Sequence, residues 1–479
     1  MRRDRLFELL GTTTDTRGNA TGTWRYFRPV LADRQPLCAA ECPAGNNIRE
    51  FVRLAAEGDF HAALAAIKKE NPLPATCGRV CHHPCASVCS RNGVDRPVAV
   101  NLIERMLGDM APEHSACLPA PRDTTGKAVA VIGSGPAGLS CAYHAALLGH
   151  TVTIFEAEAA PGGMLRHGIP AYRLPREKLD ADLHFIDALG IELRTGRPIR
   201  DLKELDGYDA VCLALGAHAS RRLDIPGRDA PQVWGGLSFL RAVNTGAAPQ
   251  PGSRAVIIGG GNTAMDCARA ALRLGAHATV CYRRTREDMP ALPDEIAEAV
   301  AEGVAFEFQA MPSGIEPRRD RGARVEFIRT QMGEPGPDGR RHPEPVPGSK
   351  FELDADIVIT ALGETPETGW LPGEFIASAG AVAADGVTGM VNTDARRGLF
   401  AAGDASAWGA RTVSHAIGAG KRAALAMDIF LNGESEIAGD ILARIAVGGG
   451  QALCSRMYRD GLPQAPVAAI AALDINKAH

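Results

Sequence analysis

The sequence contains no long hydrophobic run and no excess of charge of one sign. No window reaches the roughly 18 apolar residues of a membrane-spanning helix. The apolar patch in the N-terminal stretch MRRDRLFELLGTTTDTRG is too short for a secretory signal. The formal net charge is -4, from 52 Lys and Arg against 56 Asp and Glu. These absences argue against a membrane or a nucleic acid as the main partner, and they predict a cytoplasmic protein.

The chain is too long for a single hydrophobic core, since its 479 residues predict two to four domains. The first part reads as mostly helical, and after the linker PAPRDTTG strands and helices alternate. We therefore predict an α/β protein with an N-terminal all-α domain and two Rossmann-like α/β domains. The expected parts are the helical domain (1–120), the first dinucleotide-binding domain in two pieces (126–245 and 363–431), the second one (250–362), and a C-terminal tail that could dock a partner (432–479).

The first dinucleotide-binding motif lies between an apolar strand and an apolar helix. Gly133, Gly135 and Gly138 form G-x-G-x-x-G, with Pro136 and Ala137 between the last two. The first glycine allows a tight turn, the second lets a pyrophosphate approach, and the third lets helix and strand pack closely. Glu156 ends the next strand, 23 positions after Gly133, where a carboxylate can accept hydrogen bonds from ribose hydroxyls.

Three later motifs indicate which dinucleotide the first domain binds. PGGML (161–165), GIPAYRLP (168–175) and LFAAGDAS (399–406) follow in this order. The combination resembles flavoproteins with two dinucleotide-binding domains, in which these positions hold FAD. The resemblance implies that Gly162, Gly163 and Leu165 lie near the flavin and its ribityl chain. It also implies that Gly403 and Asp404 contact the ribityl or pyrophosphate region, and that a helix starting near Thr412 directs its positive end at the isoalloxazine.

A second motif of the same kind begins 126 residues after the first. Gly259, Gly261 and Ala264 form G-x-G-x-x-A around Asn262 and Thr263. The next strand ends in Arg283 and Arg284 rather than in a carboxylate. Because a guanidinium matches the 2′-phosphate of NADP, NADP(H) is favoured over NAD(H). Solvated arginines without a ligand are the alternative.

No Cys-x-x-Cys pair stands between residues 126 and 431, so electrons must leave a flavin by a route other than a redox disulfide. Six cysteines instead crowd into the helical part, and every short gap between them is three residues. Iron–sulfur clusters, zinc and a redox switch all use such thiolates, and the gaps favour clusters over zinc knuckles. Pro84 and Gly78 are expected to bend the chain so that the ligands converge. The six are Cys38, Cys42, Cys77, Cys81, Cys85 and Cys89.

With the stretch CPAGNNIREFVRLAAEGDFHAALAAIKKENPLPATCGRVCHHPC, the chain resembles the small subunit of glutamate synthase. It is also similar to the amino-terminal half of dihydropyrimidine dehydrogenase. The resemblance implies two [4Fe–4S] clusters. Glu104 would complete one cluster, unless it is a plain surface glutamate, and its other ligands would be Cys42, Cys81 and Cys85.

The second group departs from the pattern of these families. Relatives carry a Cys-x2-Cys just before the position of Cys38, but here no cysteine precedes it. Cys38 and Cys89 remain, with Cys77 as a plausible third ligand. A fourth would have to come from His82, His83, another group or a partner chain, so one or two [4Fe–4S] clusters are expected.

The sequence therefore predicts an electron-transfer flavoprotein subunit of a hetero-oligomer, which connects NAD(P)H or NAD(P)+ to iron–sulfur chemistry through FAD. No residue set for making or breaking a carbon skeleton is evident, so the substrate step is assigned to a partner subunit. The altered cysteine group favours a 2-oxoacid, aldehyde or ferredoxin oxidoreductase complex. The alternatives are the small subunit of glutamate synthase itself and a redox-sensing or assembly subunit without turnover.

Overall fold

The computed structural model describes residues 36–110, 117–318, 322–336, 341–391, 398–407 and 411–433. Most of the predicted tail (432–479) and the segment before Pro36 lie outside these ranges. Among the described residues, no helix is long and apolar enough to cross a membrane.

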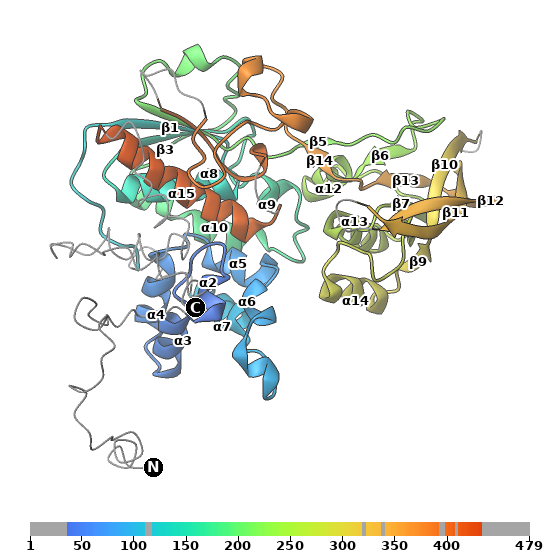
Figure 1. Cartoon of the computed structure of the whole chain (residues 1–479), viewed down its shortest axis with the longest axis horizontal. Helices are drawn as coiled ribbons and strands as arrows, with labels where there is room; N and C mark the ends of the chain where they lie inside the picture. The colour runs from blue at the N-terminus through green and yellow to red at the C-terminus, as the bar shows by residue number, and fades with distance from the viewer. Residues whose placement is uncertain are drawn as a thin grey trace, which may run out of the picture. The chain divides into compact units, whose positions relative to one another are not determined.

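The N-terminal part is helical, as predicted, and is drawn in blue in Figure 1. Its helices are α2 (Leu37–Ala40), α3 (Ile48–Ala56), α4 (Phe60–Lys68), α5 (Pro74–Val80), α6 (Pro84–Ser87) and α7 (Val100–Gly108). Helices α3 and α4 form the expected hairpin, because Gly58 adopts a φ of +82° and Asp59 caps α4 by accepting from the Ala62 amide. Phe51, Leu64 and Ile67 are fully buried between them.

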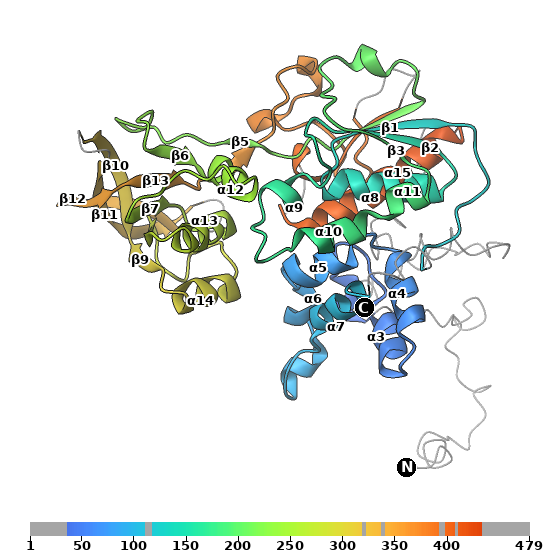
Figure 2. The ribbon, with the colours of Figure 1, turned by 180° about the vertical axis from the view of Figure 1, so that it is seen from behind.

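The first sheet is parallel and has the strand order β15-β4-β1-β2-β3. Its strands are β1 (Ala128–Ile132), β2 (Thr151–Phe155), β3 (Glu192–Arg194), β4 (Ala210–Leu213) and β15 (Gly398–Ala401). Helices α8 (Pro136–Leu147) and α15 (Val413–Leu431) lie side by side against it (Figures 1 and 2). A segment from near the end of the chain thus joins the sheet that begins at residue 128. The short helices α9 (Met164–His167), α10 (Arg176–Leu183) and α11 (Phe185–Ala188) follow β2.

The second parallel sheet has the order β6-β13-β7-β8-β9. Its strands are β6 (Val233–Gly235), β7 (Arg254–Ile258), β8 (His277–Tyr282), β9 (Ala305–Phe308) and β13 (Ile357–Thr360), with helices α12 (Gly236–Asn244), α13 (Asn262–Arg273) and α14 (Pro293–Ala301). An antiparallel sheet of β10 (Ala310–Pro317), β11 (Ala323–Pro335) and β12 (Arg341–Ala355) follows. The predicted fold class, all-α then two Rossmann-like α/β units, is confirmed.

The helical domain contacts the first α/β unit through buried polar groups. The Tyr143 hydroxyl donates to the Lys68 carbonyl at 2.5 Å. The Asp182 carboxylate accepts from the backbone amides of Ala75 and Thr76 at 3.2 and 2.7 Å. Because these residues are buried, the contacts fix the cysteine-bearing helices against α8 and α10.

Candidate functional site

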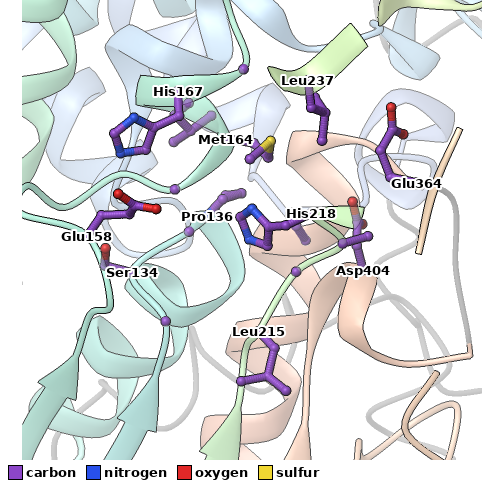
Figure 3. A pocket seen from close by; sticks show the side chains of 18 of the residues that line it. Ser134, Pro136, Glu158, Met164, His167, Leu215, His218, Leu237, Glu364 and Asp404 are labelled. Atoms are coloured by element: carbon purple, nitrogen blue, oxygen red, sulfur yellow. The ribbon is translucent and has the colours of Figure 1, made fainter. Parts of the chain in front are cut away.

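A cavity of about 920 Å³ opens where the loops after β1, β2 and β4 meet the start of α15. Figure 3 shows Ser134, Pro136, His167, His218 and Asp404 among the side chains around it. Residues at the start of α13, in the second α/β unit, also line this cavity. Its size is at the upper end of ligand sites in proteins, as a dinucleotide requires.

In the first glycine motif, each of the three positions requires glycine for a different physical reason. Gly133 has a φ of +98°, and a Cβ there would lie 2.4 Å from the Ala214 carbonyl oxygen. At Gly138 a Cβ would lie 1.9 Å from the Gly133 oxygen. Gly135 has nothing within 4 Å of such an atom, and it lines the cavity. Gly135 therefore leaves room for a ligand, beside the uncapped amides at the start of α8, where Pro136 and Ala137 also line the cavity. This cradle fits a pyrophosphate.

Glu156 is buried, and its carboxylate holds the glycine turn. Its Oε2 accepts from the Ser134 amide at 2.8 Å and from the Ser134 hydroxyl. Its Oε1 accepts from the Glu158 amide at 2.8 Å. Glu156 lines the cavity, so a ribose contact stays a prediction, with turn support as a role that the sequence did not indicate.

Only some residues of the downstream motifs line the same cavity. Gly163, with a φ of +51°, packs so close that a Cβ would lie 2.8 Å from the Gly135 Cα atom, and the fully buried Leu165 follows it. Both line the cavity, whereas Gly162 does not and instead forms the turn against Leu179. Gly403 likewise serves packing, because a Cβ there would lie 2.7 Å from the Cβ of Ala137.

Asp404 and Thr412 line the cavity at the start of α15. Burial raises the pKa of Asp404, and Arg411 opposes this shift. The Thr412 side chain caps α15 by accepting from the His415 amide. The cap leaves the remaining amides of the first turn available to a ligand.

Two cavity residues were missed by sequence reasoning. His167 Nε2 and His218 Nδ1 are buried and have no hydrogen-bond partner among the described residues. Burial lowers the pKa of both rings, so they are neutral near pH 7. Buried polar atoms without a partner are what a bound ligand would satisfy. A lone histidine after a turn carries no sequence signal for this role.

In the second glycine motif, as in the first, one glycine permits the turn and another leaves space for a ligand. Gly259 has a φ of +146°, and a Cβ there would lie 2.2 Å from the Ala361 oxygen, whereas Gly261 faces open space. Ala264 is fully buried where the first motif has its third glycine. Asn262 and Thr263 line the large cavity, and Asn262 Oδ1 accepts from the Leu292 amide at 2.9 Å. The turn fits a second pyrophosphate.

The two arginines predicted to select NADP(H) differ in their surroundings. Arg283 is exposed, whereas Arg284 is buried and its Nε has no hydrogen-bond partner among the described residues. Neither lines the large cavity. A buried guanidinium nitrogen without an acceptor fits a phosphate ligand, since such a group costs free energy when left unpaired.

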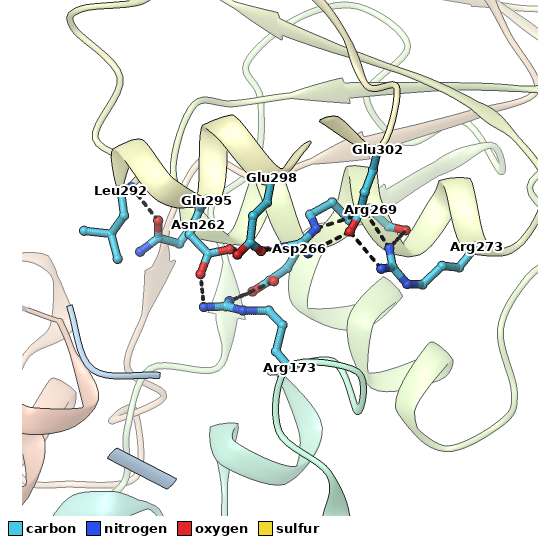
Figure 4. A network of polar contacts seen from close by, with 9 residues as sticks. All are labelled: Arg173, Asn262, Asp266, Arg269, Arg273, Leu292, Glu295, Glu298 and Glu302. Carbon is cyan, nitrogen blue, oxygen red and sulfur yellow. Dashed lines mark hydrogen bonds and ion pairs between the residues drawn. The ribbon is translucent and has the colours of Figure 1, made fainter. Parts of the chain in front are cut away.

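An ionic network joins the two α/β units (Figure 4). Arg173, from the GIPAYRLP stretch, contacts both carboxylate oxygens of Asp266 in α13 at 2.8 Å, and it also pairs with Glu295 in α14. Asp266 and Glu295 raise the pKa of Arg173, against the effect of its burial, so the guanidinium is charged. The network gives this stretch a role as a contact between the units, in addition to its position at the cavity.

Four cysteines and Glu104 line a second, small pocket in the helical domain. They come from different elements: Cys42 follows α2, Cys77 lies in α5, Cys81 ends it, and Cys85 lies in α6. The sharp bend comes from His83, whose φ of +53° is left-handed, just before Pro84. The expected bend at Gly78 was wrong. Helix α5 runs through it, and a Cβ there would lie 2.4 Å from the Arg105 amide, so Gly78 permits α5 and α7 to pack closely.

Glu104 is buried rather than a plain surface glutamate. Its Oε1 accepts from the amide groups of Asn46 and Asn71 at 3.1 and 3.0 Å. Burial raises the pKa of the Glu104 carboxyl to about 7. The two asparagines, which sequence reasoning did not single out, fix the carboxylate in the pocket beside the thiols. This donor set of thiols and one oriented carboxyl fits an iron–sulfur cluster with ligands Cys42, Cys81, Cys85 and Glu104.

Cys77 lies with the first group rather than with Cys38 and Cys89. It is 2% exposed and lines the pocket, where burial raises the pKa of its thiol well above the usual value. Cys38 and Cys89 are partly exposed and lie outside this pocket, on the contacting elements α2 and the turn after α6. These two thiols by themselves do not fit a four-ligand cluster.

Among the described residues, no group of three or more His, Cys, Asp or Glu side chains is placed to hold a single metal ion. Ligands of a single ion converge on one point, whereas thiolates at the corners of a cluster lie farther apart.

The start of α15 adjoins both the cavity and the pocket. Thr412, Val413 and Ala416 line the large cavity, and Ser414 lines the cysteine pocket. Burial raises the pKa of the Cys81 thiol, and a hydrogen bond with Ser414 partly offsets this shift. The two candidate cofactor sites therefore share one helix turn.

Comparison with known proteins identifies two family models in the chain. The pyridine nucleotide-disulphide oxidoreductase model matches residues 127–421, and the dihydropyrimidine dehydrogenase domain II, 4Fe-4S cluster, model matches residues 30–116. The chain is 39% identical over 449 residues to the NADPH-Fe(3+) oxidoreductase subunit beta of Geobacter sulfurreducens, covering 86% of this chain and 66% of that protein. It is 36% identical to the glutamate synthase [NADPH] small chain of Escherichia coli, covering 82% of this chain and 88% of that one.

The NADP(+)-dependent formate dehydrogenase subunit beta of Moorella thermoacetica is 38% identical, with coverage of 82% of this chain and 60% of that protein. The chain thus spans slightly under two thirds of the length of several curated relatives. FprA of Mycobacterium tuberculosis, solved in complex with NADPH, has a TM-score of 0.53 at 20% identity, covering 67% of this chain and 90% of that one, and shares the fold.

The chain belongs to the pyridine nucleotide-disulphide oxidoreductase family, in the branch that contains the glutamate synthase small chain. The predictions of FAD, NADP(H) and a [4Fe–4S] cluster as cofactors are confirmed at the level of these families. Its relatives are named as subunits, which supports a hetero-oligomer. The domain boundaries and the individual site residues stay predictions.

Proposed function

We propose that this chain is the nucleotide-oxidising subunit of a hetero-oligomeric oxidoreductase, which exchanges electrons between NADP(H) and a partner subunit. FAD supplies the conversion between hydride transfer and single-electron transfer. The observation that carries the proposal is the shared first turn of α15, because Thr412 lines the dinucleotide cavity and Ser414 lines the cysteine pocket. Two cofactor sites that share a helix turn are close enough for electrons to pass directly.

The residues of the chain would hold the groups rather than react with them. Gly135 and the first amides of α8 would bind the FAD pyrophosphate, with Gly163, Leu165 and Asp404 beside the rest of the flavin. Gly261, Asn262 and Thr263 would bind the pyrophosphate of NADP(H), and Arg284 its 2′-phosphate. Cys42, Cys81, Cys85 and Glu104 would bind the cluster.

The second cysteine group requires a contribution from outside this set. His82, one candidate ligand, is engaged by Ser414 Oγ at 3.4 Å from its Nδ1 atom. His83 lines the first pocket. We therefore propose that a second cluster at Cys38 and Cys89 assembles only with ligands from a partner chain.

Relatives are named for formate-, iron- and glutamate-linked activities, and any of these partner types is compatible with the site. We favour a 2-oxoacid, aldehyde or ferredoxin oxidoreductase partner because of the incomplete second group. The small-chain role in glutamate synthase is the second candidate, because this chain covers 88% of that relative. We propose a cytoplasmic location, since thiolate ligands persist in a reducing compartment.

The test is to measure iron, FAD and nucleotide reactivity on protein purified without oxygen. We expect about four irons and one FAD per chain, because one complete ligand set is present. NADPH should bleach the flavin rapidly and then reduce an artificial one-electron acceptor. No flavin reduction by either nucleotide would refute the proposal and favour the sensing or assembly role. About eight irons would refute the proposed dependence of the second cluster on a partner.

Nucleotide choice is tested with Arg284→Gln, and Arg53→Gln, on an exposed helix face, serves as the matched control. We expect Arg284→Gln to raise the Kd for NADPH by about tenfold, because one charge-assisted phosphate contact is lost. The Kd for NADH should not change. Equal effects on both nucleotides would show that Arg284 does not read the 2′-phosphate.

A further inference from the structure

His82 and Ser414 meet where the large cavity and the cysteine pocket adjoin. His82 lines the large cavity, and it follows Cys81 directly in the chain. Ser414 lines the cysteine pocket and is 2% exposed. Ser414 Oγ lies 3.4 Å from His82 Nδ1, although 332 residues separate them in the sequence. Ser414 and Cys81 both line the cysteine pocket.

The ring of His82 is fixed by its surroundings. It stacks on the ring of His415 with 5.4 Å between the centroids and 23° between the planes. His415 is in turn held by Thr412, whose Oγ1 lies 2.8 Å from its Nδ1. A ring with these contacts keeps one orientation between the cavity and the pocket. The contact also spans two elements, α15 and the turn after α5, that no local sequence pattern brings together.

We propose that His82 and Ser414 form the junction through which single electrons pass between the flavin in the large cavity and the cluster bound by Cys81. This inference rests on the proposed function and assigns the path within it. FAD, when bound, would take two electrons and one proton from NADPH as a hydride. It would release the electrons singly to the cluster bound by Cys81, which would pass the first to an acceptor in the partner subunit before taking the second, and the flavin proton would pass to water in the cavity. His82 and Ser414 make and break no covalent bond.

Other contacts also approach both sites. Val80, on the other side of Cys81, lines the large cavity as His82 does. A Cβ on Gly418 would lie 1.9 Å from the Pro43 oxygen, and Gly418 is two residues beyond Ala416, which lines the cavity. His82 differs from these residues because it lines the cavity and is also in polar contact with Ser414, which lines the cysteine pocket.

The experiment uses the complete protein with its cofactors and compares Ser414→Ala and His82→Phe with wild type. Ser414→Ala removes the hydroxyl that contacts the His82 ring, and His82→Phe keeps a stacking ring but loses Nδ1. The control is Ser87→Ala, an exposed serine on α6 that lines neither site. Flavin reduction by NADPH is followed by stopped-flow absorbance, and cluster reduction by freeze-quench EPR.

We expect cluster reduction, measured relative to flavin reduction in the same variant and per bound cluster, to slow several-fold in Ser414→Ala and His82→Phe but not in Ser87→Ala. Iron content, FAD content and the EPR spectrum after chemical reduction are measured for every variant, so that rates are compared only between proteins that hold both cofactors. Wild-type rates of cluster reduction in both variants would overturn the proposal. So would a slowing that is fully explained by shifted midpoint potentials, since the driving force and not the path would then have changed.

Should one variant lose iron, the other decides the outcome, because the two side chains come from different elements. Failure of the proposed function looks different from failure of this inference. If the proposed function fails, the wild-type protein itself will show a flavin that NADPH reduces and a cluster that stays oxidised.

Discussion

The first α/β unit, called here the flavin-binding unit, contacts its two neighbours through interfaces that differ in how deeply their central charges are buried. Toward the helical domain, Lys421 Nζ donates to Glu70 at 2.9 Å and to the Ala44 carbonyl at 2.8 Å, and both side chains are 1% exposed. Toward the second α/β unit, the central pair of Arg173 and Asp266 is 13% and 8% exposed, and the pair of Arg241 with Glu158 is 41% and 36% exposed. Lys178 and Asp109 form a partly exposed pair at the helical side as well, so the two interfaces differ in how deeply the central pair is buried.

The difference has a physical consequence for the two transfers in which FAD would take part. A buried ion pair is costly to break, because each ion would be left without its partner in a low-dielectric interior. An interface of partly exposed ion pairs separates at lower cost, because water and salt replace the partners. We therefore expect the contact on the cluster side to be the more rigid of the two, and the contact beside the nucleotide to be the more adaptable.

The largest expected effect comes from breaking the buried pair. Lys421→Met leaves Glu70 buried without its ammonium partner, and we expect a loss of about 3–5 kcal/mol in the stability of this interface. Urea unfolding followed by iron release measures it. Lys69→Met, an exposed lysine next to the same region, should leave the midpoint unchanged. Equal midpoints for both variants would contradict the role given to Lys421.

A smaller loss is expected from a single added methyl group on α15. In Gly418→Ala the new Cβ would lie 1.9 Å from the Pro43 oxygen, so the helix or the turn after Cys42 must shift. Such overpacking costs about 1–3 kcal/mol. Gly207→Ala, where nothing lies within 4 Å of the new atom, is the matched control. An unchanged urea midpoint for Gly418→Ala would show that the interface is looser than the contact implies.

Removing the Arg173 guanidinium should affect only the interface between the two α/β units. Arg173→Ala leaves the buried Asp266 carboxylate without the guanidinium that contacts both of its oxygens. We expect this to lower the free energy of unfolding by about 1–3 kcal/mol. Hydrogen exchange should accelerate in α13 and α14, and iron content should not change. The control Arg53→Ala removes ion pairs on an exposed helix surface and should change neither readout. Iron loss from Arg173→Ala would mean that the two interfaces are coupled.

The smallest expected effect comes from salt. Raising the ionic strength from about 0.1 M to about 1 M shortens the Debye length from about 10 Å to about 3 Å. Hydrogen exchange at α14, which carries the partly exposed Glu298, should increase modestly, while exchange at the Tyr143 and Lys68 contact should stay constant. A similar salt response at both places would remove the distinction between them.

Sequence reasoning reached the parts of the site that depend on local spacing. The glycine turns were predicted because a positive φ and a close strand–helix approach constrain residue type within a few positions, as Gly133 and Gly259 show. The grouping of Cys42, Cys81 and Cys85 with Glu104 came from a family resemblance, and the structure brings all four to one pocket. The bend attributed to Gly78 was wrong, because a glycine that permits helix packing and one that breaks a helix look alike in sequence.

The residues that reasoning missed act across long distances in the chain. Asn46 and Asn71 orient Glu104 although they lie in two other segments of the chain. In the sequence, both look like ordinary loop or cap residues. His218 Nδ1 lacks a hydrogen-bond partner among the described residues only because the fold buries it in the cavity. No periodic pattern encodes such placements, since they depend on which elements pack together.

By itself, the sequence determined the two dinucleotide turns, the helical cysteine domain and the cofactor classes, because short-range backbone geometry and ligand chemistry restrict the residue types that can serve. Only the tertiary structure decided that α15 lies between the two sites, that Ser414 meets His82, and that the central ion pair is more deeply buried toward the helical domain than toward the second α/β unit. These features depend on burial and on contacts between distant segments, which exist only once the chain has folded.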